Sequence, residues 1–137
     1  MSHWQLHPQL AVDTHPVACW ALSELRLMDD THHPWLMLVP RVAGATELVD
    51  LDPAAQITLM AEISRTSHAL RSVFAPDKLN VAALGNMVPQ LHVHVIARYL
   101  TDIAWPRPVW GIANAQPYSP DALADTVSKL QAALAHP

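Results

Sequence analysis

Polar and apolar residues alternate along the stretch that begins at Gln90 and reads Gln-Leu-His-Val-His-Val-Ile. A period of two residues predicts a half-buried β-strand, which we place at residues 90–99. The polar face of this strand carries Gln90, His92 and His94, and the opposite face is aliphatic. We therefore expect one face to pack in the core while two imidazoles lie side by side on the other face.

Three other segments have the pattern of strands. Residues 24–39 predict a β-hairpin, because two apolar runs flank a turn at residues 29–34 whose side chains readily bond their own backbone. Residues 78–84 predict a further strand. Residues 1–16 contain two prolines and predict an extended arm with one short strand.

Apolar residues repeat at helical spacing in two segments. Asp52 and Pro53 favour the start of a long helix, and one apolar stripe continues from there to about Phe74. Residues 119–121 favour the start of a C-terminal helix, and residues 101–118 before it have no regular pattern. Hairpin-joined strands without βαβ alternation predict an α+β fold: an antiparallel sheet of about five strands with one long helix and a C-terminal helix.

Composition limits the classes of protein that this chain can belong to. Its 137 residues are enough for one domain, which we take as residues 1–137. Hydrophobic residues make up 51% of the chain and charged residues 15%, so part of the apolar surplus is expected at a subunit interface. The net charge of −4 provides no basic surface of the kind that nucleic-acid binding requires.

The single cysteine, Cys19, excludes an intrachain disulfide and fits a reducing compartment. The N-terminus lacks the basic start and apolar run of a signal peptide, and no segment is apolar enough to span a membrane. We therefore expect a cytoplasmic protein with no membrane partner.

The segment before the histidine strand has the composition of an anion-binding turn. Residues 85–89, Gly-Asn-Met-Val-Pro, are turn-prone and can present backbone N–H groups to an anion. Together with His92 and His94, such a turn favours phosphate-ester or phosphoramidate chemistry. The same pattern also fits a polar strand face covered by a partner subunit, and spacing alone does not separate the two interpretations.

Residues 90–98 resemble the motif of the histidine triad family, His-φ-His-φ-His-φ-φ, where φ is apolar. The chain keeps the second and third histidines as His92 and His94, has Gln90 in place of the first, and continues to Arg98. Arg98 follows the strand as it does in relatives, and we interpret it as part of a surface ion pair.

The resemblance extends from about residue 20 to residue 100, which leaves residues 101–137 as a C-terminal extension. The pair Gly85 and Asn86 stands where the family carries Gly-Gln, and residues 35–40 are similar to an earlier family strand that often ends in Val-x-Pro. The Trp-Pro-Arg-Pro-Val-Trp-Gly segment is similar to a feature of a bacterial subgroup that shares the Gln-φ-His-φ-His pattern.

Membership of this family would imply a nucleotide phosphoramidate or dinucleoside polyphosphate hydrolase, or a nucleotidyl transferase. The resemblance implies that His92 is the nucleophile of a nucleotidyl-histidine intermediate and that His94 donates to the transferring phosphoryl group. It also implies a purine nucleotide substrate, no cofactor and a homodimer.

The resemblance also assigns candidate substrate-binding residues. Near the phosphate these are Gly85, Asn86, Met87 and Val88. Asp29 or Asp30 would contact the ribose, and the sequence does not choose between them. Trp105 and Trp110 would form the floor of a base pocket, seal a dimer interface or pack in the core.

Three positions depart from the family pattern. Gln90 either donates its amide to phosphate or fills the space of the first histidine, and we prefer the second interpretation. Met87 replaces a Ser or Thr that would donate to the leaving group, and Trp35 replaces a histidine. These departures favour the first alternative function, a non-catalytic nucleotide-binding module. A second is metal binding by His92 and His94, for which no sequence-local third ligand is present.

Overall fold

The computed structural model describes residues 3–135, so the first two residues of the predicted arm lie outside the described part. One antiparallel sheet has the strand order β1-β2-β3-β5-β4. The strands are β1 (Thr14–Cys19), β2 (Ser23–Met28), β3 (Trp35–Pro40), β4 (Lys78–Ala82) and β5 (Val93–Arg98). The helices are α1 (Pro8–Asp13), α2 (Pro53–Phe74) and α3 (Pro120–Ala135), with a 3-10 turn, η1, at Leu48–Asp50. The α+β fold with a five-stranded antiparallel sheet is confirmed.

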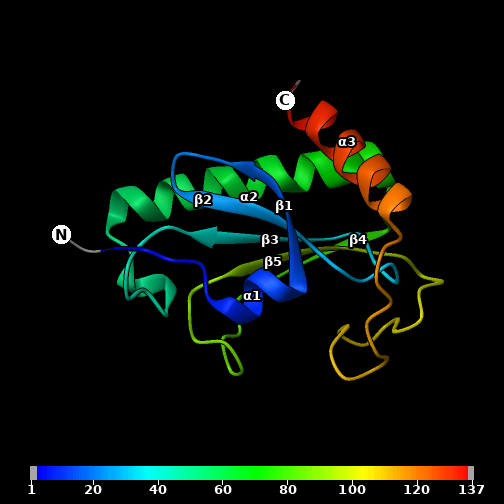
Figure 1. The fold of residues 1–137 in the computed structure, drawn as a ribbon, viewed down its shortest axis with the longest axis horizontal. Coiled ribbons are helices and arrows are strands. Elements are labelled where there is room, and N and C mark those ends of the chain that lie inside the picture. Colours follow the sequence, from blue (N-terminus) through cyan, green and yellow to red (C-terminus); the bar gives the residue numbers. More distant parts are fainter. Residues whose placement is uncertain (1–2, 136–137) are drawn as a thin grey trace.

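The sheet separates a helical layer from a layer of loops (Figure 1). Helices α2 and α3 cover one face, and the main core lies beneath them. Leu36 and Leu38 of β3 and Val93 and Val95 of β5 belong to this core and are almost fully buried. The other face is covered by α1, the N-terminal arm and the segment that joins β5 to α3.

Strand β5 has the two faces that the alternation predicts, but it begins later. Leu91, Val93 and Val95 all pack in the core under α2. The pairing with β3 ends at Leu38 and Val93, so the strand starts at Val93, and the amide of Leu91 instead donates to the carbonyl of Ala45 at 3.0 Å. His92 therefore lies just before the strand, and His94 lies within it.

The long helix follows its predicted start and end. The Asp52 carboxylate accepts from the Ala55 amide at 2.8 Å, and Ala75 ends α2 with a left-handed φ of 45°. The first helix, α1, differs from the extended arm that the sequence predicts for residues 1–16. Pro8 occupies its first turn and the His7 imidazole accepts from the amide of Gln9 at 3.0 Å, so a local cap stabilises a segment too short to show periodicity. None of the helices within residues 3–135 is long and apolar enough to cross a membrane.

Arg98 is buried, and the expectation of a surface ion pair is wrong. Only 1% of this residue is exposed, and its guanidinium contacts both carboxylate oxygens of Asp102, at 2.8 and 3.2 Å. It also donates to the Asn80 side chain and to the Arg107 carbonyl, both at 2.7 Å. The ion pair thus fixes the segment after β5 to the end of the sheet.

Asp102 is stabilised as the charged carboxylate. Burial would raise its pKa, but hydrogen bonds from Arg98 and from the amides of Tyr99, Ala104 and Trp105 outweigh this and lower the pKa well below its usual range.

Replacing Arg98 with Met should destabilise the fold strongly, because Asp102 would remain buried without its cation. We expect a loss of about 3–5 kcal/mol in the free energy of unfolding, measured by urea denaturation. Lys129→Met is the matched control, because Lys129 and Asp125 form an ion pair of the same i,i+4 spacing, 2.9 Å apart but exposed. The control should leave the urea midpoint unchanged, and equal losses in the two variants would contradict our account of Arg98.

Candidate active site

The two histidines of the motif lie against each other on the loop-covered face of the sheet. His94 pairs with Met37 on β3 and with Ala82 on β4, so it sits inside the sheet, and His92 lies two residues earlier, just before β5 begins. Both are buried, with 7% of His92 and 4% of His94 exposed. Their ring centroids are 4.9 Å apart and the planes are inclined by 75°.

A backbone acceptor orients His92. Its Nδ1 lies 2.6 Å from the carbonyl oxygen of Gln90. Because a carbonyl only accepts, the proton of the neutral ring is on Nδ1, and Nε2 carries a free lone pair. This is the state that a nucleophilic imidazole requires.

A side-chain donor orients His94 in the opposite sense. The indole Nε1–H of Trp35 donates to Nδ1 of His94 at 3.0 Å. An indole can only donate, so the neutral ring of His94 carries its proton on Nε2. Burial lowers the pKa of His94 to about 3, and repulsion from His92 acts in the same direction. His94 therefore remains a neutral Nε2–H donor across the physiological pH range.

The two tryptophans of the segment after β5 have different positions. The Trp110 ring packs edge-on against His94 and Trp35, with centroid distances of 5.1 and 5.7 Å. Trp105 instead lies beside Arg98, and the distance from the Cζ atom of Arg98 to the centroid of the Trp105 ring is 5.6 Å. Trp110 thus belongs to the site, while Trp105 belongs to the buried anchor of the segment.

A cavity of about 410 Å³ opens in front of the two imidazoles. The predicted turn forms one wall through Gly85, Asn86, Met87 and Val88, and α1 forms another. The lining residues that lie outside this turn are Leu10, Asp13, Met28, Trp35, Met37, Leu84, His92, His94 and Trp110. The turn requires glycine at its start, because Gly85 has a φ of +76° that other residues rarely adopt.

A second cavity of about 400 Å³ adjoins the first and is acidic. Asp29 and Asp30 both line it, and Asp13 lines both cavities. One oxygen of Asp29 accepts from the Tyr118 amide at 3.0 Å, and one oxygen of Asp30 accepts from the His32 amide at 3.0 Å. Sequence reasoning missed Asp13, because it lies on the helix that was predicted as an extended arm.

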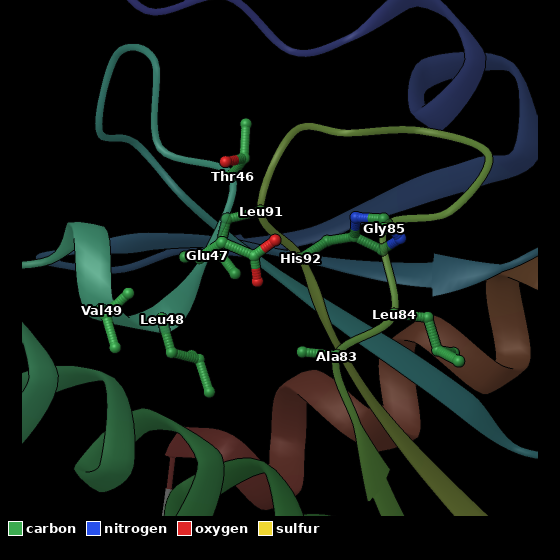
Figure 2. A pocket seen from close by; sticks show the side chains of 9 residues that line it. All are labelled: Thr46, Glu47, Leu48, Val49, Ala83, Leu84, Gly85, Leu91 and His92. Atoms are coloured by element: carbon green, nitrogen blue, oxygen red, sulfur yellow. The ribbon is translucent and has the colours of Figure 1, made fainter.

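A third, smaller cavity of about 200 Å³ shares Leu84, Gly85 and His92 with the first cavity (Figure 2). Glu47 provides its carboxylate, and Leu48, Val49 and Leu84 provide apolar walls. The His92 ring extends toward Gly85, and the nucleophile candidate lines both the first and the third cavity.

The side chain of Gln90 does not line any of these three cavities. Its amide forms two hydrogen bonds with the N-terminal arm, to the carbonyl of Gln5 and from the amide of His7, both at 2.8 Å. Within residues 3–135 no group of three or more His, Cys, Asp or Glu side chains is arranged to hold a metal ion.

Comparisons with known proteins agree on one family. The family model for the HIT domain matches residues 12–101. A histidine triad protein from Bradyrhizobium japonicum is 46% identical with a TM-score of 0.93, covering 96% of this chain and 98% of its own. A histidine triad protein from Marinobacter aquaeolei is 47% identical with a TM-score of 0.94, covering 96% of both chains.

A more distant structure shares the fold alone. It is a hypothetical histidine triad nucleotide-binding protein from Sulfolobus tokodaii, 12% identical with a TM-score of 0.69, covering 93% of this chain and 87% of its own. No curated protein matches the chain.

Replacing Trp35 with Phe should allow both tautomers of His94, because it removes the indole N–H that donates to Nδ1 of His94 and keeps an aromatic ring at this position. In long-range ¹H–¹⁵N spectra we expect wild-type His94 to stay in the Nε2–H form from pH 5 to 8, since its pKa is about 3. The variant should show a mixture of tautomers. Trp20→Phe is the control, because Trp20 packs under Arg65 in the helix-covered core. An unchanged His94 spectrum in Trp35→Phe would contradict our assignment.

The depressed pKa of His94 also predicts a pH dependence of stability. The folded state excludes a proton that the unfolded chain binds below its ordinary pKa of 6.5. The resulting contribution to stability is complete above that pH and decreases as the pH falls toward about 3.

Proposed function

Since this chain belongs to the histidine triad family, whose members hydrolyse or transfer nucleotides, we propose that it is a nucleotide phosphoramidate or dinucleoside polyphosphate hydrolase. The reaction proceeds through a nucleotidyl-histidine intermediate on His92. One observation carries the proposal: two adjacent, buried imidazoles have opposite polarity at Nε2, with a free lone pair on His92 and an N–H on His94.

The proposed chemistry has two displacements at phosphorus. The Nε2 lone pair of His92 attacks the phosphorus, a P–N bond to His92 forms, and the bond to the leaving group breaks. The leaving group takes a proton from solvent, because Met87 has no hydroxyl to donate. Water then attacks phosphorus and gives a proton back to solvent, and the bond to His92 breaks, which releases the nucleoside monophosphate. His94 donates to a phosphoryl oxygen in both steps, where negative charge increases.

The cavity in front of the imidazoles and the acidic cavity beside it would bind different parts of the proposed substrate, because they differ in charge. The phosphate binds at the turn of residues 85–88, where backbone N–H groups and the two histidines are available. The ribose binds in the acidic cavity, because carboxylates accept from sugar hydroxyls and repel phosphate. Asp13, Asp29 and Asp30 are candidates for the ribose, and Trp110 offers a surface for the purine.

A non-catalytic nucleotide-binding module is the second candidate. Met87 favours it, because a thioether side chain, 93% exposed at the phosphate turn, offers no proton to a leaving group. The same cavities would bind the nucleotide in both cases. The Sulfolobus tokodaii protein, which shares the fold, is named for nucleotide binding alone.

We also propose a homodimer in the cytoplasm, where Cys19 would remain reduced. The edge strand β4 has one unpaired side, and Val81 on it is 50% exposed. Ile57 and Met60 on α2 are 74% and 59% exposed. These apolar side chains support a symmetric contact that covers both elements.

Replacing His92 with Ala should abolish turnover, because no other group forms the covalent bond. We expect a loss of about a thousandfold or more with an adenosine phosphoramidate as substrate. After rapid quenching in alkali, which preserves the P–N bond to histidine, mass spectrometry should find a nucleotidyl group on the wild-type peptide that contains His92. His68→Ala, on the exposed surface of α2, is the control. Nucleotide binding without any turnover by the wild type would favour the non-catalytic module.

Replacing Val81 with Lys should disrupt the proposed dimer, because a charge on an edge strand opposes strand pairing. Sedimentation of the wild type at micromolar concentration should give a species of about twice 15.1 kDa, and the variant should shift toward the monomer. Val12→Lys is the control, since Val12 is 76% exposed on α1, which packs at β1 on the opposite edge. A wild type that sediments only as a monomer would exclude the dimer.

A further inference from the structure

Gln90 bridges two parts of the molecule that lie 85 residues apart in sequence. Its side-chain amide donates to the Gln5 carbonyl and accepts from the His7 amide, each at 2.8 Å. Its backbone carbonyl accepts from Nδ1 of His92 at 2.6 Å. One residue therefore contacts both the N-terminal arm (residues 3–7) and the proposed nucleophile.

The arm continues into a wall of the large cavity. Trp4 and Leu6 alternate with the two residues that Gln90 binds, and they pack on the cluster of Leu10, Met37, Val39 and Val88. His7 then caps α1, whose Leu10 and Asp13 line the cavity. The arm therefore leads directly into α1, which forms a wall of the cavity (Figure 1).

The amide group suits this bridge better than an imidazole. An amide presents a donor and an acceptor side by side, which matches a backbone C=O and N–H that are two residues apart. The two nitrogens of an imidazole point away from each other across the ring. A histidine at position 90 would therefore lose at least one of the two bonds.

We propose that Gln90 is a positioning residue that clamps the N-terminal arm and so shapes the nucleotide cavity, a role distinct from that of the triad histidine it replaces. This inference rests on the proposed function. Gln90 does not contact the reacting atoms, and the carbonyl that orients His92 is present whatever the side chain. The side chain therefore affects nucleotide binding and leaves the chemical step unchanged.

The test compares Gln90→Leu and Gln90→His with the wild type by two independent measurements. The first is hydrogen exchange at the His7 amide, which both variants should accelerate roughly fivefold to a hundredfold, the factor expected for the loss of one or two neutral hydrogen bonds. The second is steady-state hydrolysis of an adenosine phosphoramidate. Here KM should rise about tenfold while kcat changes by less than about threefold.

Gln131→Leu is the matched control. The Gln131 amide donates to the Val17 carbonyl at 2.9 Å, which is also a bond from a glutamine side chain to the backbone of an N-terminal segment. Gln131 does not line either of the cavities proposed to bind the nucleotide. This variant should leave both the exchange at His7 and the KM unchanged.

Each other result overturns the clamp. Unchanged exchange at His7 in both Gln90 variants would show that the amide does not hold the arm. Faster exchange with an unchanged KM would show that the arm does not shape the cavity, and a fall in kcat alone would place Gln90 in the chemical step. If the wild type has no turnover, the proposed function fails separately, and the Kd for adenosine monophosphate replaces KM as the second measurement.

Discussion

The site depends on the different hydrogen bonds made by two buried imidazoles. His92 and His94 are chemically identical and neighbours in space, yet one is bonded to an acceptor and the other to a donor. The Gln90 carbonyl places the proton of His92 on Nδ1, and the Trp35 indole places the proton of His94 on Nε2. The two rings thereby present opposite polarity to the same cavity. Burial reinforces this arrangement at His94, because it lowers the pKa of that ring and so disfavours the charged form in which both of its nitrogens would be donors.

Two of the three departures from the family pattern replace a titratable group with a neutral one. Trp35 and Gln90 stand where the resemblance places histidines, and neither side chain ionises. Each still makes hydrogen bonds that the fold uses: Trp35 fixes His94, and Gln90 fixes the arm. A site with fewer titratable side chains suits the proposed mechanism, in which the tautomers of His92 and His94, rather than their charges, decide which ring attacks and which ring donates.

Walls from outside the motif complete the site. Helix α1 contributes Leu10 and Asp13, and the segment after β5 contributes Trp110. Both are irregular or short pieces of chain that could not hold their position alone, and each has a specific anchor. The amide of Gln90 holds the first, and the buried pair of Arg98 and Asp102 holds the second. These anchors lie at opposite ends of the histidine segment. Residues at both ends of the motif therefore hold the walls of the cavity in place, while the histidines between them provide the chemistry.

The sequence alone determined the features that depend on local periodicity and local capping. The alternation after Gln90 separated a core face from a histidine face, and Asp52 marked the start of the long helix. The family motif pointed to His92 and His94 together with the turn before them. Packing decided the rest. Whether Arg98 is exposed, where β5 begins and which backbone groups meet the Gln90 amide depend on segments up to 85 residues away, which no local pattern encodes. The tautomers of the two histidines are also decided by the tertiary structure, because each depends on whether the fold brings a donor or an acceptor to Nδ1 of that ring.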